Sequence, residues 1–183
     1  MIKIVLAFLM LSGLLYADRD GGPYIGIGYG NSEYKSGGLY DSIKEEKAKL
    51  QYFYGGAYIN KHLSVEMGYA KMQDGGFNID DSIKLDYTLY NVSTLAHYAF
   101  FNDVWDFYAK FGAGQAKVNG EDGFSLIYGI GTSIRFSELF SVKLAYDIYE
   151  FGYDEEESDG THDSASDYKQ RIYYPYIALE FQF

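Results

Sequence analysis

The feature that most constrains the fold is a strict alternation of residue types in the last segment of the chain. Ile177, Leu179, Phe181 and Phe183 alternate there with Tyr176, Ala178, Glu180 and Gln182. Successive side chains of a β-strand point to opposite faces, so this segment has one apolar face and one smaller or more polar face. A soluble protein turns the apolar face inward, whereas a membrane barrel turns it outward against lipid.

Seven further segments show the same period of two. With the last one, they cover residues 23–32, 48–59, 63–72, 84–99, 107–117, 124–136, 140–150 and 168–183. Their lengths match or exceed the roughly 9–11 residues that a tilted transmembrane strand needs. Short turns are expected after the second, fourth and sixth segments and longer loops after the first, third, fifth and seventh, an asymmetry typical of outer-membrane barrels.

The face opposite the apolar one carries mostly glycine, serine and charged residues, which cannot form the core of a soluble barrel or sandwich. In the first segment, Ile25, Ile27 and Tyr29 oppose three glycines. An even number of strands can close and leave no unpaired edge in hydrocarbon. The sequence therefore predicts an all-β fold, an eight-stranded antiparallel up-and-down transmembrane β-barrel.

In two of the segments, the alternation does not settle which set of residues forms the outer face. In residues 48–59 we expect an outer face of Leu50, Tyr52, Tyr54 and Tyr58, with Phe53 and Ile59 competing for it. In residues 84–99 we expect Tyr90, Val92, Thr94, Ala96 and Tyr98 outside, and Asn91, Ser93 and His97 inside. The first half of that segment fits the opposite phase, which indicates a bulge or a frayed start.

The N-terminus predicts a secretory signal peptide. Lys3 supplies a positive charge, and the apolar run 4–15 is interrupted only by Ser12 and Gly13. This run is shorter than the roughly 20 residues of a membrane-spanning helix. Cleavage after Ala17 divides the chain into a signal peptide, residues 1–17, and a barrel domain, residues 18–183.

Charge and motifs exclude several functions. A formal net charge of −11 argues against a surface that neutralises nucleic-acid phosphates. Gly26 and Gly28 do not form a nucleotide-binding loop, because Asn31 stands where the third glycine belongs. We therefore expect neither a nucleic-acid partner nor a cofactor.

The glycine-containing runs 24–30, 65–69, 110–114 and 129–131, together with the terminal Phe183, carry a family resemblance. The chain resembles the small eight-stranded outer-membrane barrels of Gram-negative bacteria, the OmpA/OmpX-like group. The resemblance implies residence in the cell outer membrane after signal-peptide cleavage, contact with outer-membrane lipids and lipopolysaccharide, and a monomeric barrel. It also implies an assembly signal, Phe181 and Phe183, that the outer-membrane assembly machinery reads.

The inward faces predict an ion network in the lumen. Its members are Glu66, Lys110, Arg135, Lys143, Asp147 and Glu180. Eight strands enclose an interior just wide enough for side chains to fill, and opposite charges should pair there because an isolated buried charge is unfavourable. We expect a filled, salt-bridged lumen, and a gated ion path is the alternative.

The acidic segment 150–167 contains eight carboxylate residues and no lysine or arginine. Asp154, Glu156 and Asp159 form a weak candidate for a divalent-cation site, because Asp159 stands where a calcium loop of the EF-hand type needs glycine. The alternative is a solvated loop that charge repulsion extends.

Catalysis has little support in the sequence. Ser93 and His97 share one face of a strand, but four residues along a strand span about 13 Å, far beyond hydrogen-bond reach. His162, Asp163 and Ser164 are of the triad types, yet adjacency in a loop is not triad geometry. We expect a non-enzymatic outer-membrane barrel with a side-chain-filled lumen, which supports envelope integrity or surface interactions through its extracellular loops. A narrow ion-conducting pore is the first alternative and a lipid-modifying enzyme the second.

Overall fold

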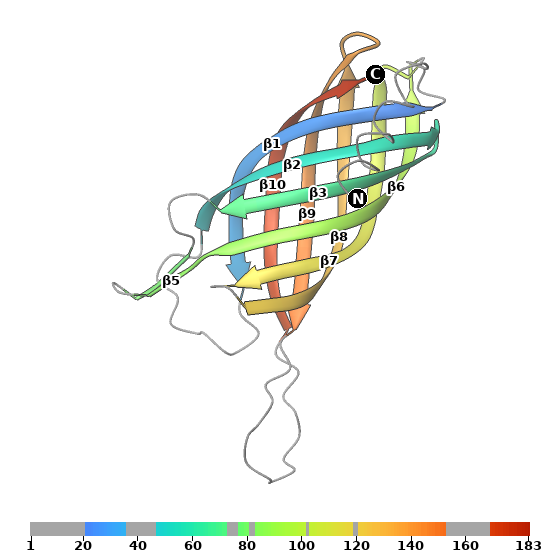
Figure 1. The fold of residues 1–183 in the computed structure, drawn as a ribbon. Coiled ribbons are helices and arrows are strands. Elements are labelled where there is room, and N and C mark those ends of the chain that lie inside the picture. The colour runs from blue at the N-terminus through green and yellow to red at the C-terminus, as the bar shows by residue number, and fades with distance from the viewer. Residues whose placement is uncertain are drawn as a thin grey trace.

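The computed structural model describes residues 21–35, 47–72, 77–80, 83–101, 103–118, 121–152 and 169–183. Eight of its strands close into an antiparallel barrel in the order β1-β10-β9-β8-β7-β6-β3-β2 (Figure 1), which confirms the predicted fold class. The barrel strands are β1 (Gly22–Lys35), β2 (Lys47–Asn60), β3 (Leu63–Met72), β6 (Tyr87–Phe100), β7 (Trp105–Val118), β8 (Glu121–Arg135), β9 (Phe140–Gly152) and β10 (Lys169–Gln182). Within these described ranges, no helix is long and apolar enough to cross a membrane.

Two predicted features lie outside the described residues. They are the signal peptide, residues 1–17, and the candidate cation site at Asp154, Glu156 and Asp159.

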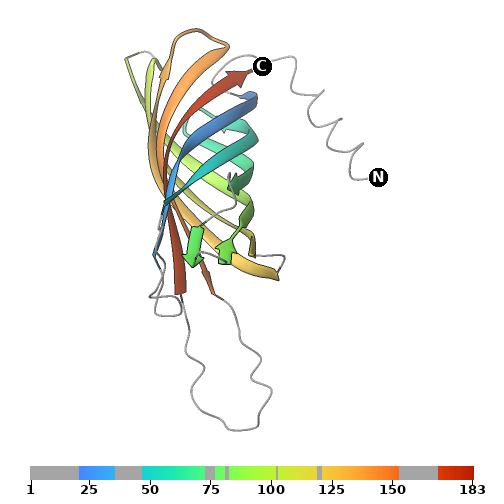
Figure 2. The same cartoon turned by 90° about the vertical axis from the view of Figure 1, so that its left-hand side faces the viewer.

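A short hairpin stands apart from the barrel, where the sequence predicted a loop and the start of a strand. β4 (Phe77–Asp80) pairs with β5 (Ile83–Leu85) in a separate two-stranded sheet (Figure 2). Asp86 separates β5 from β6, and the faces of β6 alternate uniformly from Tyr87. The opposite phase in the first half of the predicted strand 84–99 arises because Tyr87 and Leu89 on β6 are buried in the lumen, whereas most apolar residues of the second half face outward.

Both ends of the described chain and the short turns lie at one end of the barrel. Tyr24 on β1 is opposite Gln182 on β10, and the backbone N–H of Phe183 donates to the carbonyl of Pro23 over 2.9 Å. This end is periplasmic by the usual orientation of such barrels, with the other end extracellular. β7 and β8 stay paired as far as Val118 and Glu121, so only two residues separate these strands, where a longer extracellular loop was expected.

The strand faces match the predicted ones in seven of the eight barrel strands, and β2 is reversed. The four residues predicted to face lipid, Leu50, Tyr52, Tyr54 and Tyr58, are buried, whereas Phe53 and Ile59 are exposed on the outer wall. The reversal has a steric cause in the neighbouring strands. Tyr54 is opposite Gly26 on β1, which leaves the interior space that its ring occupies, and Gly68 on β3 leaves the space for the ring of Tyr52.

Candidate functional site

Large side chains fill the extracellular part of the lumen. They are Tyr34, Leu50, Tyr87, Leu89, Tyr149, Phe151, Ile172 and Tyr174, none more than 1% exposed. Several of their contacts join strands that are not neighbours in the barrel. The Tyr174 hydroxyl donates to the carbonyl of Leu50 over 2.9 Å, and the Tyr87 hydroxyl donates to Gln170 Oε1 over 3.3 Å. These mostly aromatic side chains, which we call the aromatic layer, therefore cross the lumen from wall to wall.

A buried ion cluster lies on the periplasmic side of this aromatic layer. Lys110 Nζ on β7 is 2.9 Å from Glu66 Oε1 on β3 and 2.8 Å from Asp147 Oδ2 on β9. Lys143 forms an ion pair with Glu180 and lies 3.9 Å from Glu66 Oε2. Because β3, β7 and β9 are not neighbours, these pairs bridge the lumen. The cluster combines two lysines with three carboxylates.

Tyrosine rings and hydroxyls complete the surroundings of both lysines. Tyr52 donates to Glu66 Oε1 over 2.8 Å, and Tyr176 donates to Asp147 Oδ2 over 3.1 Å. Lys110 Nζ lies 4.7 Å from the centroid of the Tyr52 ring. Lys143 Nζ lies 4.9, 5.0 and 5.4 Å from the ring centroids of Tyr24, Tyr54 and Tyr108. Such cation–π contacts gain strength when the cation is desolvated.

Arg135, the sixth predicted member of the network, lies apart from this cluster. Its Nη2 donates to Gln182 Oε1 over 2.8 Å at the periplasmic end, and its side chain is only partly buried. The structure therefore brings five of the six predicted ions together and leaves Arg135 at the rim of the lumen.

A serine, a histidine and an aspartate from three neighbouring strands meet at the periplasmic end of the lumen. His97 Nε2 is 2.8 Å from Ser64 Oγ, and His97 Nδ1 is 2.7 Å from Asp106 Oδ2. The distances are those of a Ser-His-Asp triad. Ser93, which shares the inward face of β6 with His97, contacts Asn91 over 3.4 Å and has no part in this group.

The triad-like group is closed to substrates. Ser64 and Asp106 are 0% and 1% exposed, and the rings of Tyr58 and Tyr108 pack on His97 with centroids 5.1 and 5.7 Å away. The Ser64 hydroxyl also lies 3.3 Å from the hydroxyl of Tyr24. A reacting carbonyl would need space beside both the nucleophile and an oxyanion donor. The packed rings of Tyr58 and Tyr108 surround His97, so the structure shows a buried group of hydrogen-bonded side chains.

Sequence reasoning missed this group because it considered serine and histidine only within one strand or one loop. Ser64 and His97 come from paired strands, whose register places Ser64 opposite Leu95. It also missed the tyrosines that surround the lysines, since it assigned Tyr52 and Tyr54 to the lipid face. Across the described side chains, no group of three or more histidine, cysteine, aspartate or glutamate residues could hold a metal ion.

A closed barrel with an apolar outer wall and a paired ionic interior defines a small transmembrane β-barrel protein. A sequence profile described as "Outer membrane protein beta-barrel domain" matches residues 4–174. The chain belongs to this family, and its location is the outer membrane of a Gram-negative bacterium. No curated protein sequence matches the chain.

Several solved structures share the fold. Neisserial surface protein A (NspA) has 15% sequence identity and a TM-score of 0.63, covering 89% of this chain and 99% of its own. Ail, the attachment invasion locus protein of Yersinia pestis, has 19% identity and a TM-score of 0.54, covering 88% and 97%. The N-terminal barrel domain of Pseudomonas aeruginosa OprF has 12% identity and a TM-score of 0.55, covering 87% and 97%.

Proposed function

We propose that this chain is a non-enzymatic outer-membrane barrel, whose filled lumen supports a rigid wall and whose extracellular end makes surface contacts or maintains the envelope. The observation that carries this proposal is the set of ion pairs that cross the lumen between non-neighbouring strands. Such pairs fill an eight-stranded interior and leave the extracellular end as the part available to partners.

The similar structures support a role at the cell surface. NspA is named a surface protein, and Ail has been crystallised with the heparin analogue sucrose octasulfate. By analogy, the partners of this chain are outer-membrane lipids, lipopolysaccharide and molecules that reach the extracellular loops. The assembly machinery is its partner during biogenesis, and the finished barrel is a monomer that binds neither nucleic acid nor a cofactor.

The proposal predicts no ion conduction. Purified protein in planar bilayers is expected to show no steady unitary openings, because the aromatic layer and the ion cluster both span the lumen. The measurement is single-channel conductance in KCl, with a large porin in the same membrane as the positive control. Steady openings whose conductance changes in Lys110→Met or Glu66→Gln would instead support the narrow pore.

The proposal also predicts that Ser64 supports no hydrolysis. Ser64→Ala is expected to leave lipid A composition and ester hydrolysis unchanged, while the lost Ser64–His97 bond lowers the free energy of unfolding by about 1 kcal/mol. Mass spectrometry of lipid A from cells with wild-type, Ser64→Ala or no protein makes the test. A lipid A species that needs both the protein and Ser64 would establish the lipid-modifying enzyme.

A further inference from the structure

Buried tyrosine rings form a continuous series along the lumen. From the periplasmic end toward the extracellular end, they are Tyr58, Tyr24, Tyr54, Tyr52, Tyr176 and Tyr174, each at most 6% exposed. The centroids of successive rings are 5.0, 6.2, 5.2, 5.6 and 4.6 Å apart. We call this series the tyrosine column.

The tyrosine column connects the two ends of the lumen. Tyr174 belongs to the extracellular aromatic layer, and Tyr149 is its diagonal neighbour on the paired strand β9. In the same layer, the ring centroids of Tyr87 and Tyr34 are 6.1 Å apart. At the opposite end, Tyr58 lies two residues before the end of β2 at the periplasmic turn. Aromatic side chains therefore extend over most of the height of the barrel.

Most hydroxyls of the tyrosine column donate to a buried carboxylate. The pairs are Tyr58 with Glu180 (3.4 Å), Tyr24 and Tyr52 with Glu66 (3.4 and 2.8 Å), and Tyr176 with Asp147 (3.1 Å). Phenylalanine would fill the same volume, so filling the lumen does not account for these hydroxyls. The Tyr54 hydroxyl differs, because it has no hydrogen-bond partner among the described residues.

A phenol beside a carboxylate can lose an electron without leaving a charge on its ring. Loss of the electron alone gives a radical cation, which is unfavourable in a sealed interior where Lys110 and Lys143 already lie over tyrosine rings. If the phenolic O–H bond breaks and the proton forms a new O–H bond on the carboxylate, the products are a neutral phenoxyl radical and a carboxylic acid. The Tyr52–Glu66 distance of 2.8 Å is within reach of such a transfer.

We propose that the tyrosine column carries electrons across the outer membrane, from a one-electron reductant in the periplasm to a one-electron oxidant outside the cell. Each tyrosine that has a carboxylate acceptor gives up one electron and one proton, and it regains both when the next electron arrives. Glu66 accepts the proton of either Tyr24 or Tyr52, so the electron passes between these two across the ring of Tyr54. The inference goes beyond the proposed surface role and does not depend on it.

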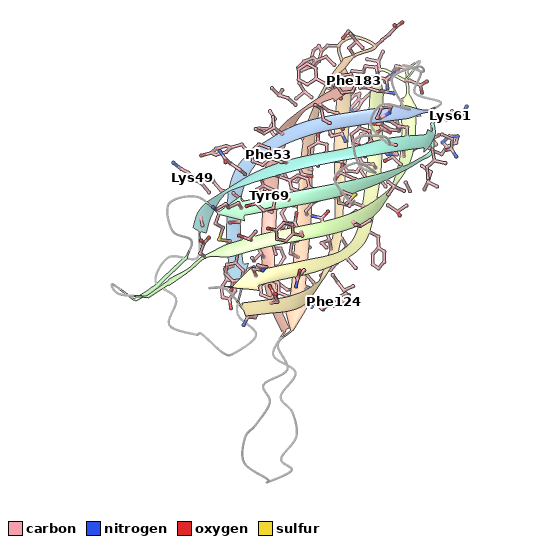
Figure 3. The ribbon with its side chains drawn as sticks, in the orientation of Figure 1. Lys49, Phe53, Lys61, Tyr69, Phe124 and Phe183 are labelled. Atoms are coloured by element: carbon pink, nitrogen blue, oxygen red, sulfur yellow. The ribbon has the colours of Figure 1, made fainter. Side chains whose placement is uncertain are left out.

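The test drives electrons through barrels of one orientation. The chain has no cysteine, so Lys49→Cys supplies one thiol near the extracellular end (Figure 3), to which a ruthenium photo-oxidant is attached. The protein is folded in vesicles with ferrocyanide trapped inside and a cobalt(III) ammine complex outside as electron acceptor. Light transfers an electron from ruthenium to cobalt, and the oxidised ruthenium takes one from the tyrosine column. We expect one ferricyanide inside for each cobalt(III) reduced outside, measured by absorbance.

Conservative variants in the Lys49→Cys background test the role of the hydroxyls. The double variant Tyr52→Phe, Tyr176→Phe keeps both rings but cannot pass protons to Glu66 or Asp147. We expect it to form ferricyanide at least about tenfold more slowly. Tyr54→Phe is the matched control within the lumen, because its hydroxyl has no acceptor, and it should retain most of the rate. Heat-modifiable gel migration verifies that each variant is folded.

A second control removes two hydroxyls from the outer wall. Tyr29 and Tyr146 are 43% and 41% exposed, and Tyr29→Phe with Tyr146→Phe should leave the rate unchanged. Equal loss in this control would overturn the inference, since electrons would then travel along the lipid-facing surface. So would ferricyanide formation no faster than in protein-free vesicles, or equal rates in wild type and the Tyr52→Phe, Tyr176→Phe variant. None of these outcomes affects the conductance or hydrolysis tests.

Discussion

Replacing Lys110 by methionine is expected to lower the free energy of unfolding by about 3–5 kcal/mol. The ammonium group pairs with Glu66 and Asp147 at 2.9 and 2.8 Å, and all three side chains are at most 2% exposed. Without it, two carboxylates face each other in a sealed interior with one fewer compensating charge. Urea titration of the protein folded in lipid vesicles measures the change.

Two further variants separate charge compensation from simple loss of a side chain. Lys117→Met removes a lysine whose side chain is 43% exposed, and it should cost at most about 1 kcal/mol. Combining Lys110→Met with Asp147→Asn removes one of the orphaned charges and should restore part of the stability. If Lys110→Met costs no more than Lys117→Met, the ion cluster does not stabilise the barrel.

Deleting Phe183 is expected to reduce the amount of barrel in the outer membrane severalfold while changing refolding in detergent only slightly. Its ring lies on the lipid-facing wall, 39% exposed, so its loss removes on the order of 1–3 kcal/mol of interfacial burial. That loss is small compared with the stability that the closed ladder of strand hydrogen bonds gives the barrel. A larger defect in cells is what we expect if the outer-membrane assembly machinery reads Phe181 and Phe183 as a signal. Quantitative blotting of outer-membrane fractions measures the amount in cells.

The matched control for this prediction is Phe136→Ala. Phe136 is another aromatic residue near the periplasmic end, 67% exposed, but it lies outside the last strand. Its removal should change refolding by a similar amount and leave outer-membrane levels near those of wild type. Equal levels of both variants in cells would show that the C-terminal aromatic residues are not a signal.

Alternation predicted the outer faces of seven strands because contact with lipid imposes the same requirement on each of them. The prediction was wrong for β2 because the interior selects by size as well as polarity. The alternation pattern treats Tyr52 and Tyr54 as apolar residues and so places them on the lipid face. In the structure their rings lie inside, where a Cβ atom at Gly68 would collide with the Tyr52 ring and one at Gly26 with the Tyr54 ring. Glycines on the strands on both sides of β2 were the available signal for large inward residues.

The interior ions could be predicted as a set, but their pairing could not. Partner choice depends on which side chains meet across the lumen, and that follows from strand tilt and register rather than from spacing along the chain. Arg135 shows the limit, because its strand face was correct and yet it contacts Gln182 instead of a carboxylate. The contact of Ser64 with His97 was missed for the same reason.

The pairing of β1 with β10 has a consequence for synthesis. The seam joins Pro23 to Phe183, so β1 can pair with β2 along one edge but keeps the backbone groups of its other edge unpaired until β10 is made. Until then every intermediate has two open ladders, which hydrocarbon does not tolerate and which can pair with other chains in water. A nonsense codon or a proteolytic cut that removes β10 leaves both β1 and β9 open, however complete the rest of the wall is. A chain that lacks β10 therefore cannot close this seam, and it carries two unpaired edges into the membrane or into contact with other chains.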